Sequence, residues 1–290
     1  MGIAIASYVH AVAWSAADDG HFERAGLKAK VDTMGGSAAT IRTLISGDID
    51  VALAGGDAVL KANAAGADLV VIGTLVGRFY HRIVVEDGTT DLRGKKIGIP
   101  FLGGPQDMAV KVALRRLGLA YGKDVEVVAL GKEFNRMAAL TEGEIDATTS
   151  QTPSSRLKDL GVSVLVDLPA TDEAFPYIVI AVQRERLKAD RSKIENAVAA
   201  LCEAAKAYRD EGNKSANLQT IASHLGNADV EGAAEDRYRT TGPTLLSYPP
   251  VVDRGALQAV IELAELDASL LDRTVDESVI AALQDAGKCT

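Results

Sequence analysis

The sequence is poor in the residues that build metal centres and covalent active sites. Only two of its 290 residues are cysteine, four are histidine, and aromatic side chains make up 4%. No two histidines stand at the i, i+4 spacing of a helical metal site, and the cysteines form no cluster. Phosphate-binding and dinucleotide-binding glycine motifs are missing, as is a Gly-x-Ser-x-Gly nucleophile motif. We therefore expect no metal and no cofactor, and no sequence motif points to an enzyme.

The chain also lacks an excess of positive charge and a long apolar run. Its formal net charge is −9, which argues against a nucleic-acid partner because phosphate binding needs clustered Lys and Arg. No apolar run approaches the ~18 residues needed to cross a membrane. Met1 leads directly into a predicted strand, without the charged and apolar regions of a secretion signal. We expect either a cytosolic protein or a mature chain whose signal has been removed.

The two cysteines allow two interpretations. Cys202 lies in an apolar helical pattern and is most simply a buried free thiol, whereas Cys289 is one residue from the end. A disulfide between them is the alternative. Two cysteines do not by themselves fix the redox compartment.

What the sequence does contain is an alternation of strand and helix patterns. Hydrophobic residues make up 47% of the chain. This composition, with few aromatics, predicts parallel sheets covered by helices on both faces rather than an antiparallel sandwich. A chain of 290 residues would normally divide into two domains.

One α/β unit occurs twice. Leu44-Ile-Ser-Gly-Asp-Ile-Asp50 is answered, 96 positions later, by Leu140-Thr-Glu-Gly-Glu-Ile-Asp146. The opening strand over residues 3–6 matches residues 97–100 at a shift of 94. Matches in the same order favour two related lobes over chance recurrence, with a ligand held at loops near the strand ends. Asp50 and Asp146 are equivalent in this repeat and are interpreted as strand-entry residues, not as an acid–base pair.

The predicted strand ends carry several candidate ligand contacts. Ser37 follows two glycines and caps a predicted helix, where its hydroxyl and the free amides would suit a carboxylate or sulfonate. The alternative is that Ser37 is only a cap. Tyr8, His10 and Trp14 cluster near the end of the first strand. Trp14 either packs in the core or stacks on a ligand, and His10 is more simply a loop histidine than a catalytic base.

At this point the sequence resembles a known family, the nitrate/sulfonate/thiamine-precursor group of periplasmic solute-binding proteins, also called the thiamine-precursor-synthase-like superfamily. The resemblance covers about residues 1–225. It rests on Gly35-Gly-Ser-Ala-Ala39, Leu44-x-x-Gly-x-Ile-Asp-Val-Ala52, Asp91-Leu-Arg-Gly-Lys-Lys-Ile-Gly98, Leu114-x-x-Leu-Gly-Leu119, Lys123-Asp-Val125, Ala139-Leu-x-x-Gly-x-Ile-Asp-Ala147 and Phe175-Pro176.

The resemblance implies an α/β, type II periplasmic-binding-protein fold: two Rossmann-like lobes with a central ligand cleft and two hinge crossings. Lobe 1 would comprise residues 1–85 and 182–290, and lobe 2 residues 86–181. Helical patterns at 215–225, 229–238, 254–264 and 276–284 are expected to pack on lobe 1. We expect the crossings near 84–88 and 178–183, because the second copy of the repeat lies between these two extended segments. Such a monomer captures a small molecule in the periplasm, or while lipid-anchored in a Gram-positive, and delivers it to an ABC transporter permease.

The ligand contacts that the resemblance implies follow the family's strand-end loops. They are Tyr8, His10, Trp14, Gly36, Ser37, Gly56, Asp57, Phe101, Gly103, Lys132, Phe134, Gln151 and Thr152. Residues 103–107 depart from the family because they lack a hydroxyl and end in an acid. This departure favours a larger organic solute with one polar end, such as a sulfonate, a carboxylate or a heteroaromatic, over bare nitrate or sulfate.

Two other classes stay open. The first is a cytosolic enzyme of the same fold, acting in pyrimidine or menaquinone-precursor synthesis or on aromatic acids, in which His10 or His81 would be the base or acid. The pyrimidine synthases of this superfamily carry a cysteine-rich motif that is missing here. The second is a ligand-sensing module without a transporter.

Overall fold

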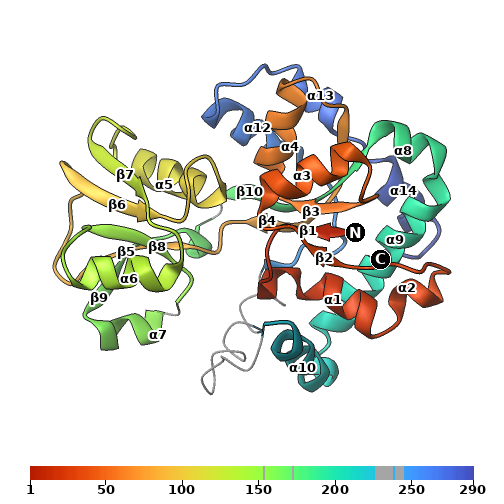
Figure 1. The fold of residues 1–290 in the computed structure, drawn as a ribbon, viewed down its shortest axis with the longest axis horizontal. Helices are drawn as coiled ribbons and strands as arrows, with labels where there is room; N and C mark the ends of the chain where they lie inside the picture. The colour runs from red at the N-terminus through yellow and green to blue at the C-terminus, as the bar shows by residue number, and fades with distance from the viewer. Residues whose placement is uncertain (153, 172, 226–237, 239–244) are drawn as a thin grey trace. The chain divides into compact units, whose positions relative to one another are not determined.

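The chain folds into two units and passes from one to the other twice (Figure 1). The computed structural model describes residues 1–152, 154–171, 173–225, 238 and 245–290. Unit 1 comprises Met1–Gly77 and Ala174–Thr290, and unit 2 comprises Arg78–Glu173. Both boundaries lie eight residues before the expected ones at 85/86 and 181/182. Most residues of the expected crossing segments, 84–88 and 178–183, belong to strands that pair within a single sheet. The chain therefore passes from one unit to the other before each of these strands.

Unit 1 contains a five-stranded mixed sheet in the order β2-β1-β3-β10-β4. Strands β1, β2 and β3 are parallel, whereas β10 runs antiparallel to β3. The antiparallel strand belongs to the chain's return from unit 2, which explains its direction. The strands span Gly2–Ile3 (β1), Asp32–Thr33 (β2), Ala52–Ala54 (β3), Leu69–Arg78 (β4) and Ala174–Gln183 (β10).

Helices cover both faces of the unit 1 sheet. Figure 1 shows α3, α4 and α12 on one face and α1 and α9 on the other. The long α9 buries its predicted apolar face against α1 and α2. The expected helix over 229–238 lies outside the described residues, apart from Tyr238. The helices span Ala11–Asp18 (α1), His21–Arg24 (α2), Ser37–Ser46 (α3), Gly56–Ala64 (α4), Arg184–Ala189 (α8), Arg191–Arg209 (α9), Lys214–Leu225 (α10), Arg254–Leu263 (α12), Leu270–Thr274 (α13) and Ser278–Asp285 (α14).

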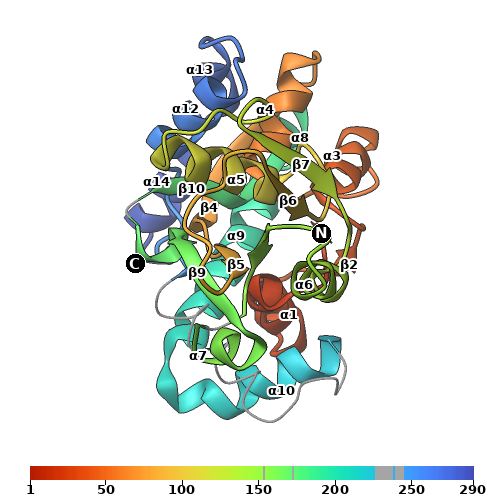
Figure 2. The same cartoon turned by 90° about the vertical axis from the view of Figure 1, so that its left-hand side faces the viewer.

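Unit 2 repeats this plan with the order β7-β6-β8-β5-β9. Here β5 is the antiparallel strand, and it pairs with both β8 and β9. Helices α5 and α6 flank the sheet (Figure 2), and α6 contributes Ala139 and Leu140 to the core. The elements are β5 (Arg82–Glu86), β6 (Lys95–Ile99), α5 (Pro105–Arg116), β7 (Val125–Ala129), α6 (Glu133–Thr141), β8 (Ala147–Ser150), α7 (Ser154–Leu157) and β9 (Val162–Asp167).

Strand register shows that the three strands β1, β2 and β3 repeat as β6, β7 and β8 at a shift of 96. Gly2 pairs with Asp32 and Ala52, and Gly98 pairs with Val128 and Thr148, so every partner moves by 96 positions. The shift of 94 for the opening strand is therefore wrong. Side chains alternate between the faces of a strand, so a slip of two residues preserves the hydrophobic pattern and escapes sequence analysis.

Equivalent glycines on β1 and β6 accommodate the same isoleucine contact. A Cβ on Gly2 would lie 2.5 Å from Ile49 Cδ1, and a Cβ on Gly98 would lie 2.6 Å from Ile145 Cδ1. Each isoleucine follows the repeated helix, and Ile49 packs over β1 as Ile145 packs over β6. An added Cβ would force the isoleucine to shift in both units, and this shared contact supports the equivalence of Gly2 and Gly98.

The two cysteines form a disulfide. Cys202 in α9 is bonded to Cys289, with their Cα atoms 5.5 Å apart and both residues fully buried. The interpretation of Cys202 as a free thiol is therefore wrong, and the alternative, a disulfide between the two cysteines, is confirmed. The 87 positions between the two cysteines hide this proximity from local patterns. The disulfide fixes the C-terminal end of the chain to the longest helix of unit 1.

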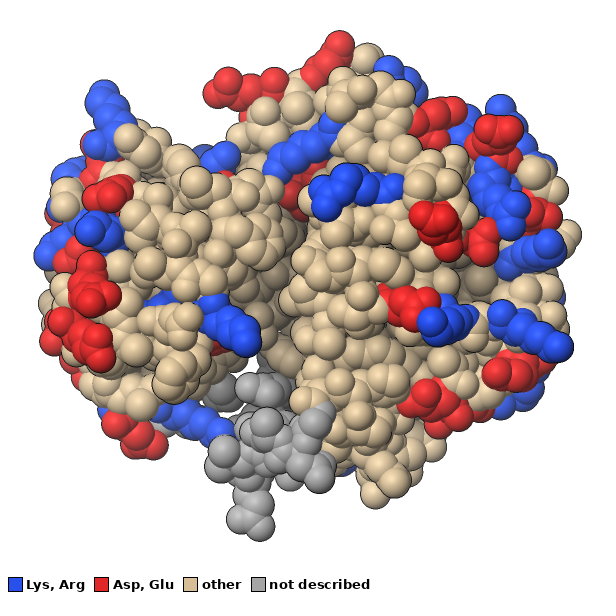
Figure 3. Space-filling model, in the orientation of Figure 1, with Lys and Arg blue, Asp and Glu red and all other residues tan. Residues whose placement is uncertain are grey.

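Charge is mixed on the face that Figure 3 shows. Lys and Arg side chains are scattered among Asp and Glu and do not gather into a basic stripe. Among the described residues, no helix has the length and apolarity that a membrane-spanning segment requires.

Candidate ligand-binding site

The start of α3 in unit 1 leaves backbone amides available for a ligand. Gly36 has a φ of 135°, a conformation that a side chain would strain, and its N–H donates to the Ala4 carbonyl at 2.5 Å. The first helical bond runs from Thr40 N–H to the Gly36 carbonyl at 3.0 Å. The amides of residues 37–39 therefore precede the first helical bond, and the first turn contains no acid. A helix start of this kind attracts anions.

Ser37 does not cap its own helix, contrary to the sequence-based expectation. It is the first residue of α3, the N-cap position is Gly36, and no side-chain capping bond forms. Instead, Ser37 Oγ accepts the N–H of Gly55 at 3.0 Å and ties the helix start to the loop after β3. Because the hydroxyl oxygen is the acceptor in this bond, the hydroxyl proton can still be donated to an anion.

Gly56 and Asp57 begin α4 and are both buried. A Cβ on Gly56 would lie 2.7 Å from the Pro176 Cβ, so close packing against β10 requires glycine here. The N-cap position of α4 is Gly55. The Asp57 carboxylate accepts Lys61 Nζ at 3.2 Å. Burial raises the pKa of Asp57, and the charge of Lys61 opposes that rise.

The structure buries the aromatic and imidazole candidates of unit 1. Tyr8, His10 and Trp14 are 5%, 2% and 3% exposed. Trp14 stacks on His224, with ring centroids 4.6 Å apart and planes 2° apart. Burial lowers the pKa of His10 to about 4, against the opposing effect of the Leu53 carbonyl, so the imidazole is neutral at pH 7. The burial of Trp14 and its stacking on His224 fit the core-packing interpretation, and stacking of Trp14 on a ligand stays a prediction.

Exposed apolar side chains gather at strand ends. Of the seven large hydrophobic side chains that are exposed in the described part of the chain, four follow the carboxyl ends of parallel strands: Ile5, Phe101, Leu102 and Phe134. Phe134 is the most exposed, at 83%. Ile5 and Phe101 are equivalent at the shift of 96. Exposed groups of this kind often contact a ligand, so the predicted contacts Phe101 and Phe134 are accessible to a solute.

Unit 2 places an uncharged polar cluster around His81. Its Nε2 lies 2.6 Å from Gln106 Nε2 and 2.9 Å from Gln151 Nε2. Amide nitrogens are donors, so His81 Nε2 accepts and we assign its proton to Nδ1. Burial, and after it the positive charges of Arg136 and Arg82, lower the pKa of His81 to about 3. The sequence analysis predicted Gln151 as a contact but missed Gln106. Gln106 could have been found because it lies 96 positions after His10 and is therefore its equivalent in the repeat.

The starts of α5 and α6 carry acids that bond to their own unit. Asp107 accepts the Gly103 N–H at 2.9 Å and the Tyr121 hydroxyl. Glu133 Oε1 accepts from the Ser150 hydroxyl at 2.5 Å, the Gln151 N–H at 3.0 Å and the Thr152 hydroxyl at 3.3 Å. The acid after Gly103 is therefore engaged within unit 2 and not presented to a solute.

Arg136 holds together the loops that carry the unit 2 candidates. It is 2% exposed and stands at the position equivalent to Thr40. Its Nε donates to Thr148 Oγ1 at 3.0 Å, and its terminal nitrogens donate to the carbonyls of Thr149, at 3.0 Å, and Gly131. Burial lowers the pKa of Arg136, and the charge of Glu133 opposes this. Sequence reasoning missed this residue because an arginine on a helix is usually exposed.

The remaining predicted contacts lie at the surface of unit 2. Lys132 is exposed and forms the N-cap position of α6, equivalent to Gly36. Gly103 is exposed with a φ of 77°, and Thr152 is half-buried. Within each unit, the structure therefore brings the predicted loops to the same edge of the sheet.

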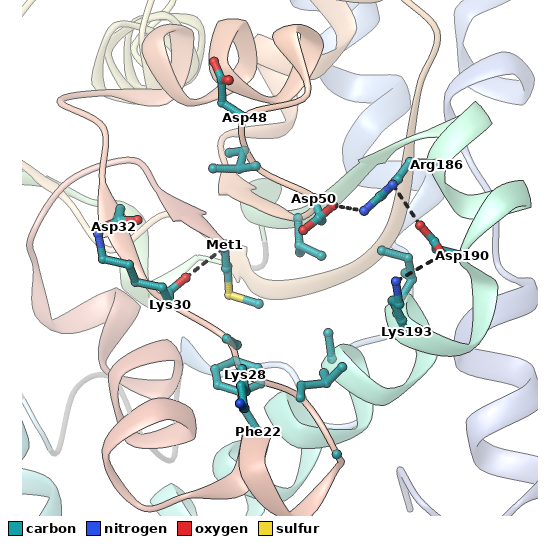
Figure 4. A pocket seen from close by; sticks show the side chains of 17 residues that line it. Met1, Phe22, Lys28, Lys30, Asp32, Asp48, Asp50, Arg186, Asp190 and Lys193 are labelled. Atoms are coloured by element: carbon teal, nitrogen blue, oxygen red, sulfur yellow. Dashed lines mark hydrogen bonds and ion pairs between the residues drawn. The ribbon is translucent and has the colours of Figure 1, made fainter.

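A separate cavity of about 570 Å³ lies in unit 1 at the opposite, amino-terminal edge of β1, β2 and β3 (Figure 4). Its charged rim is paired with itself: Arg186 contacts Asp50 at 2.6 Å and Asp190 at 2.8 Å, and Lys193 contacts Asp190 at 3.4 Å. Open α/β sheets bind ligands at the carboxyl ends of their strands. This cavity is therefore not the candidate solute site.

Two sheets of matching order, each with one antiparallel strand and helix starts at one edge, define the periplasmic-binding-protein fold. The family profile described as "NMT1/THI5 like" matches residues 7–213, and the chain belongs to this family. A search of curated protein sequences found no match.

Solved structures share the fold at low sequence identity. The alkanesulfonate-binding protein SsuA from Xanthomonas axonopodis pv. citri, bound to MOPS, superposes with a TM-score of 0.75 at 19% identity, covering 95% of this chain and 97% of that one. The nitrate-binding protein NrtA from Synechocystis PCC 6803 gives 0.76 at 14% identity, covering 100% and 90%. The aliphatic sulphonate binding protein SsuA from Escherichia coli gives 0.73 at 22% identity, covering 96% and 94%.

Proposed function

We propose that the protein is the solute-binding component of an ABC importer and that it captures a small organic anion. The observation that carries this proposal is the start of α3, where the Ser37 hydroxyl and the amides of residues 37–39 are available and no acid is present. A sulfonate or carboxylate suits such a site. The apolar side chains at the strand ends suit the body of the solute. The family and the solute-binding proteins that share the fold support this role.

The disulfide supports a location outside the cytosol. Disulfides persist in oxidising compartments such as the periplasm, and both cysteines of this chain are paired. The partner that follows from the proposal is the permease of the importer, and the protein acts as a monomer that delivers its solute there. Nothing in the proposed role requires a metal or a cofactor.

The two candidate catalytic histidines fit binding better than turnover. An effective general acid or base has a pKa near the working pH. The pKa of His10 is lowered to about 4 and that of His81 to about 3, so both are deprotonated at pH 7 and would be weak bases. The enzyme alternative therefore has no acid among these residues at neutral pH.

A recovery experiment separates the two alternatives. Aromatic and aliphatic sulfonates and carboxylates are screened by thermal shift, and the best solute is titrated by calorimetry. The protein is then incubated with that solute for a long period, and the solute is quantified by NMR. Saturable binding with full recovery of unchanged solute supports the binding protein. Conversion of the solute by the wild type, lost in His81→Gln, would establish the enzyme instead.

A further inference from the structure

The two units differ in charge at one equivalent position. Ser37 Oγ accepts the Gly55 N–H and Glu133 Oε1 accepts the Gln151 N–H, both at 3.0 Å. The same structural bond is therefore made by a neutral hydroxyl in unit 1 and by a carboxylate in unit 2. This substitution places a negative charge at the start of α6, where its counterpart α3 has none.

The carboxylate also occupies the donors of the neighbouring loop. The hydroxyls of Ser150 and Thr152 both donate to Glu133 Oε1. Each hydroxyl has a single proton, so these two groups can offer only lone pairs to a solute. At the start of α5, the carboxylate of Asp107 likewise engages Gly103 N–H and the Tyr121 hydroxyl. The Ser150 and Thr152 hydroxyls and the Gly103 amide are thus engaged inside unit 2. The amides of residues 133–135 precede the first helical bond of α6, from Arg136 N–H to the Lys132 carbonyl, but they lie beside the Glu133 carboxylate.

The other polar groups at this edge are uncharged or already bonded. His81, Gln106 and Gln151 form a neutral cluster. The Arg136 guanidinium is buried and donates to Thr148, Gly131 and Thr149. Arg82 pairs with Asp167 at 3.2 Å. Lys132 is the exposed cation at the start of α6, and a test must include it.

From these contacts we infer that the strand-end edge of unit 2 accepts only uncharged groups of a solute and that Glu133 excludes a negative charge from this edge. This inference rests on the proposed function and narrows the solute class. The favoured solute is a monoanion, and its group that meets this edge is apolar, aromatic or a neutral hydrogen-bond donor, which suits the exposed Phe101, Leu102 and Phe134. Dianions of the same skeleton are rejected because a charge near Glu133 is repelled.

The test compares two probes of one skeleton, 4-aminobenzenesulfonate and benzene-1,4-disulfonate, by calorimetry at pH 7.5 and fixed ionic strength. We expect the monoanion to bind at least tenfold more tightly. In Glu133→Gln the amide oxygen can still accept the Gln151 N–H, and we expect the preference to fall below threefold. Lys132→Met tests whether the anion binds to unit 2 instead. Glu142→Gln, which removes an exposed carboxylate at the other end of α6, is the matched control and should leave both affinities within threefold.

The outcomes distinguish the inference from the proposed function. Equal binding of both probes by the wild type, or an unchanged preference in Glu133→Gln, would overturn the exclusion role while solute binding stands. A large loss of monoanion affinity in Lys132→Met would show that the anion lies on unit 2, which also overturns the inference. If neither probe, nor any monoanion of the screen, binds the folded wild type, the proposed function fails and the inference fails with it.

Discussion

Ser37 and Glu133, 96 positions apart, make the same hydrogen bond: each accepts the backbone N–H of the residue 18 positions further along, Gly55 or Gln151, at 3.0 Å. Each bond ties a helix start to the loop after the next strand of the same unit. The repeat therefore preserves the geometry of the strand-end loops while changing their charge. The helix start in unit 1 contains no acid, whereas the equivalent start of α6 in unit 2 carries the Glu133 carboxylate.

The disulfide should contribute substantially to stability. Cross-linking residues 87 positions apart restricts the unfolded chain, and removing such a bond typically costs about 2–5 kcal/mol. We expect Cys202→Ser to lower the free energy of unfolding in urea by that amount. Cys289→Ser and the double variant should match it, because each change removes the same bond. A wild-type protein whose unfolding is unchanged by reductant would contradict the prediction.

Stability should fall as the pH is lowered below 6.5. The pKa of His10 is lowered to about 4 and that of His81 to about 3, from 6.5. Between these values the unfolded chain binds more protons, so each histidine destabilises the fold by about 1.4 kcal/mol per pH unit of acidification. The raised pKa of Asp57 acts in the opposite direction.

The variant His81→Gln isolates one of these groups. Between about pH 4 and 6 it should reduce the slope of unfolding free energy against pH by about 1.4 kcal/mol per pH unit, the contribution of one proton, because Gln does not titrate. Urea unfolding at several pH values measures the slope. The unexpected result would be a slope identical to that of the wild type.

Gly56→Ala should destabilise unit 1. The added Cβ would lie 2.7 Å from Pro176 Cβ and 3.1 Å from Leu257 Cδ2, so the helix or β10 must shift. Overpacking of this kind costs about 1–3 kcal/mol. Gly255→Ala is the control, because its Cβ would meet only Asp253 Oδ1 at 3.4 Å. Equal unfolding midpoints of the two variants would argue against a packing role for Gly56.

The sequence predicted the fold class and the repeat because both depend on local patterns. Helix stops at glycine and alternating apolar residues identified the related units, and strand pairing confirms the shift of 96. The register of the opening strand was predicted wrongly, and the Cys202–Cys289 bond was only the second of two interpretations. A two-residue slip keeps every side chain on its face, and a disulfide depends on distance in space rather than along the chain.

The site was predicted less completely than the fold. The strand-end loops were identified, but the roles of Ser37 and Arg136 depend on partners far along the chain, at Gly55 and at residues 148–149. Burial separates Tyr8, His10 and Trp14 from the exposed Phe101 and Phe134, and no local pattern distinguishes these two groups.

The measurement that tests the account most directly is a calorimetric titration of wild type and Ser37→Ala with the best monoanion of the screen. We expect one site per chain in the wild type. Loss of a hydrogen bond to a charged group costs roughly 1.5–3 kcal/mol, so the variant should bind about ten- to a hundredfold more weakly with its fold retained by circular dichroism. Equal affinity of the two proteins would contradict the anion site at the start of α3.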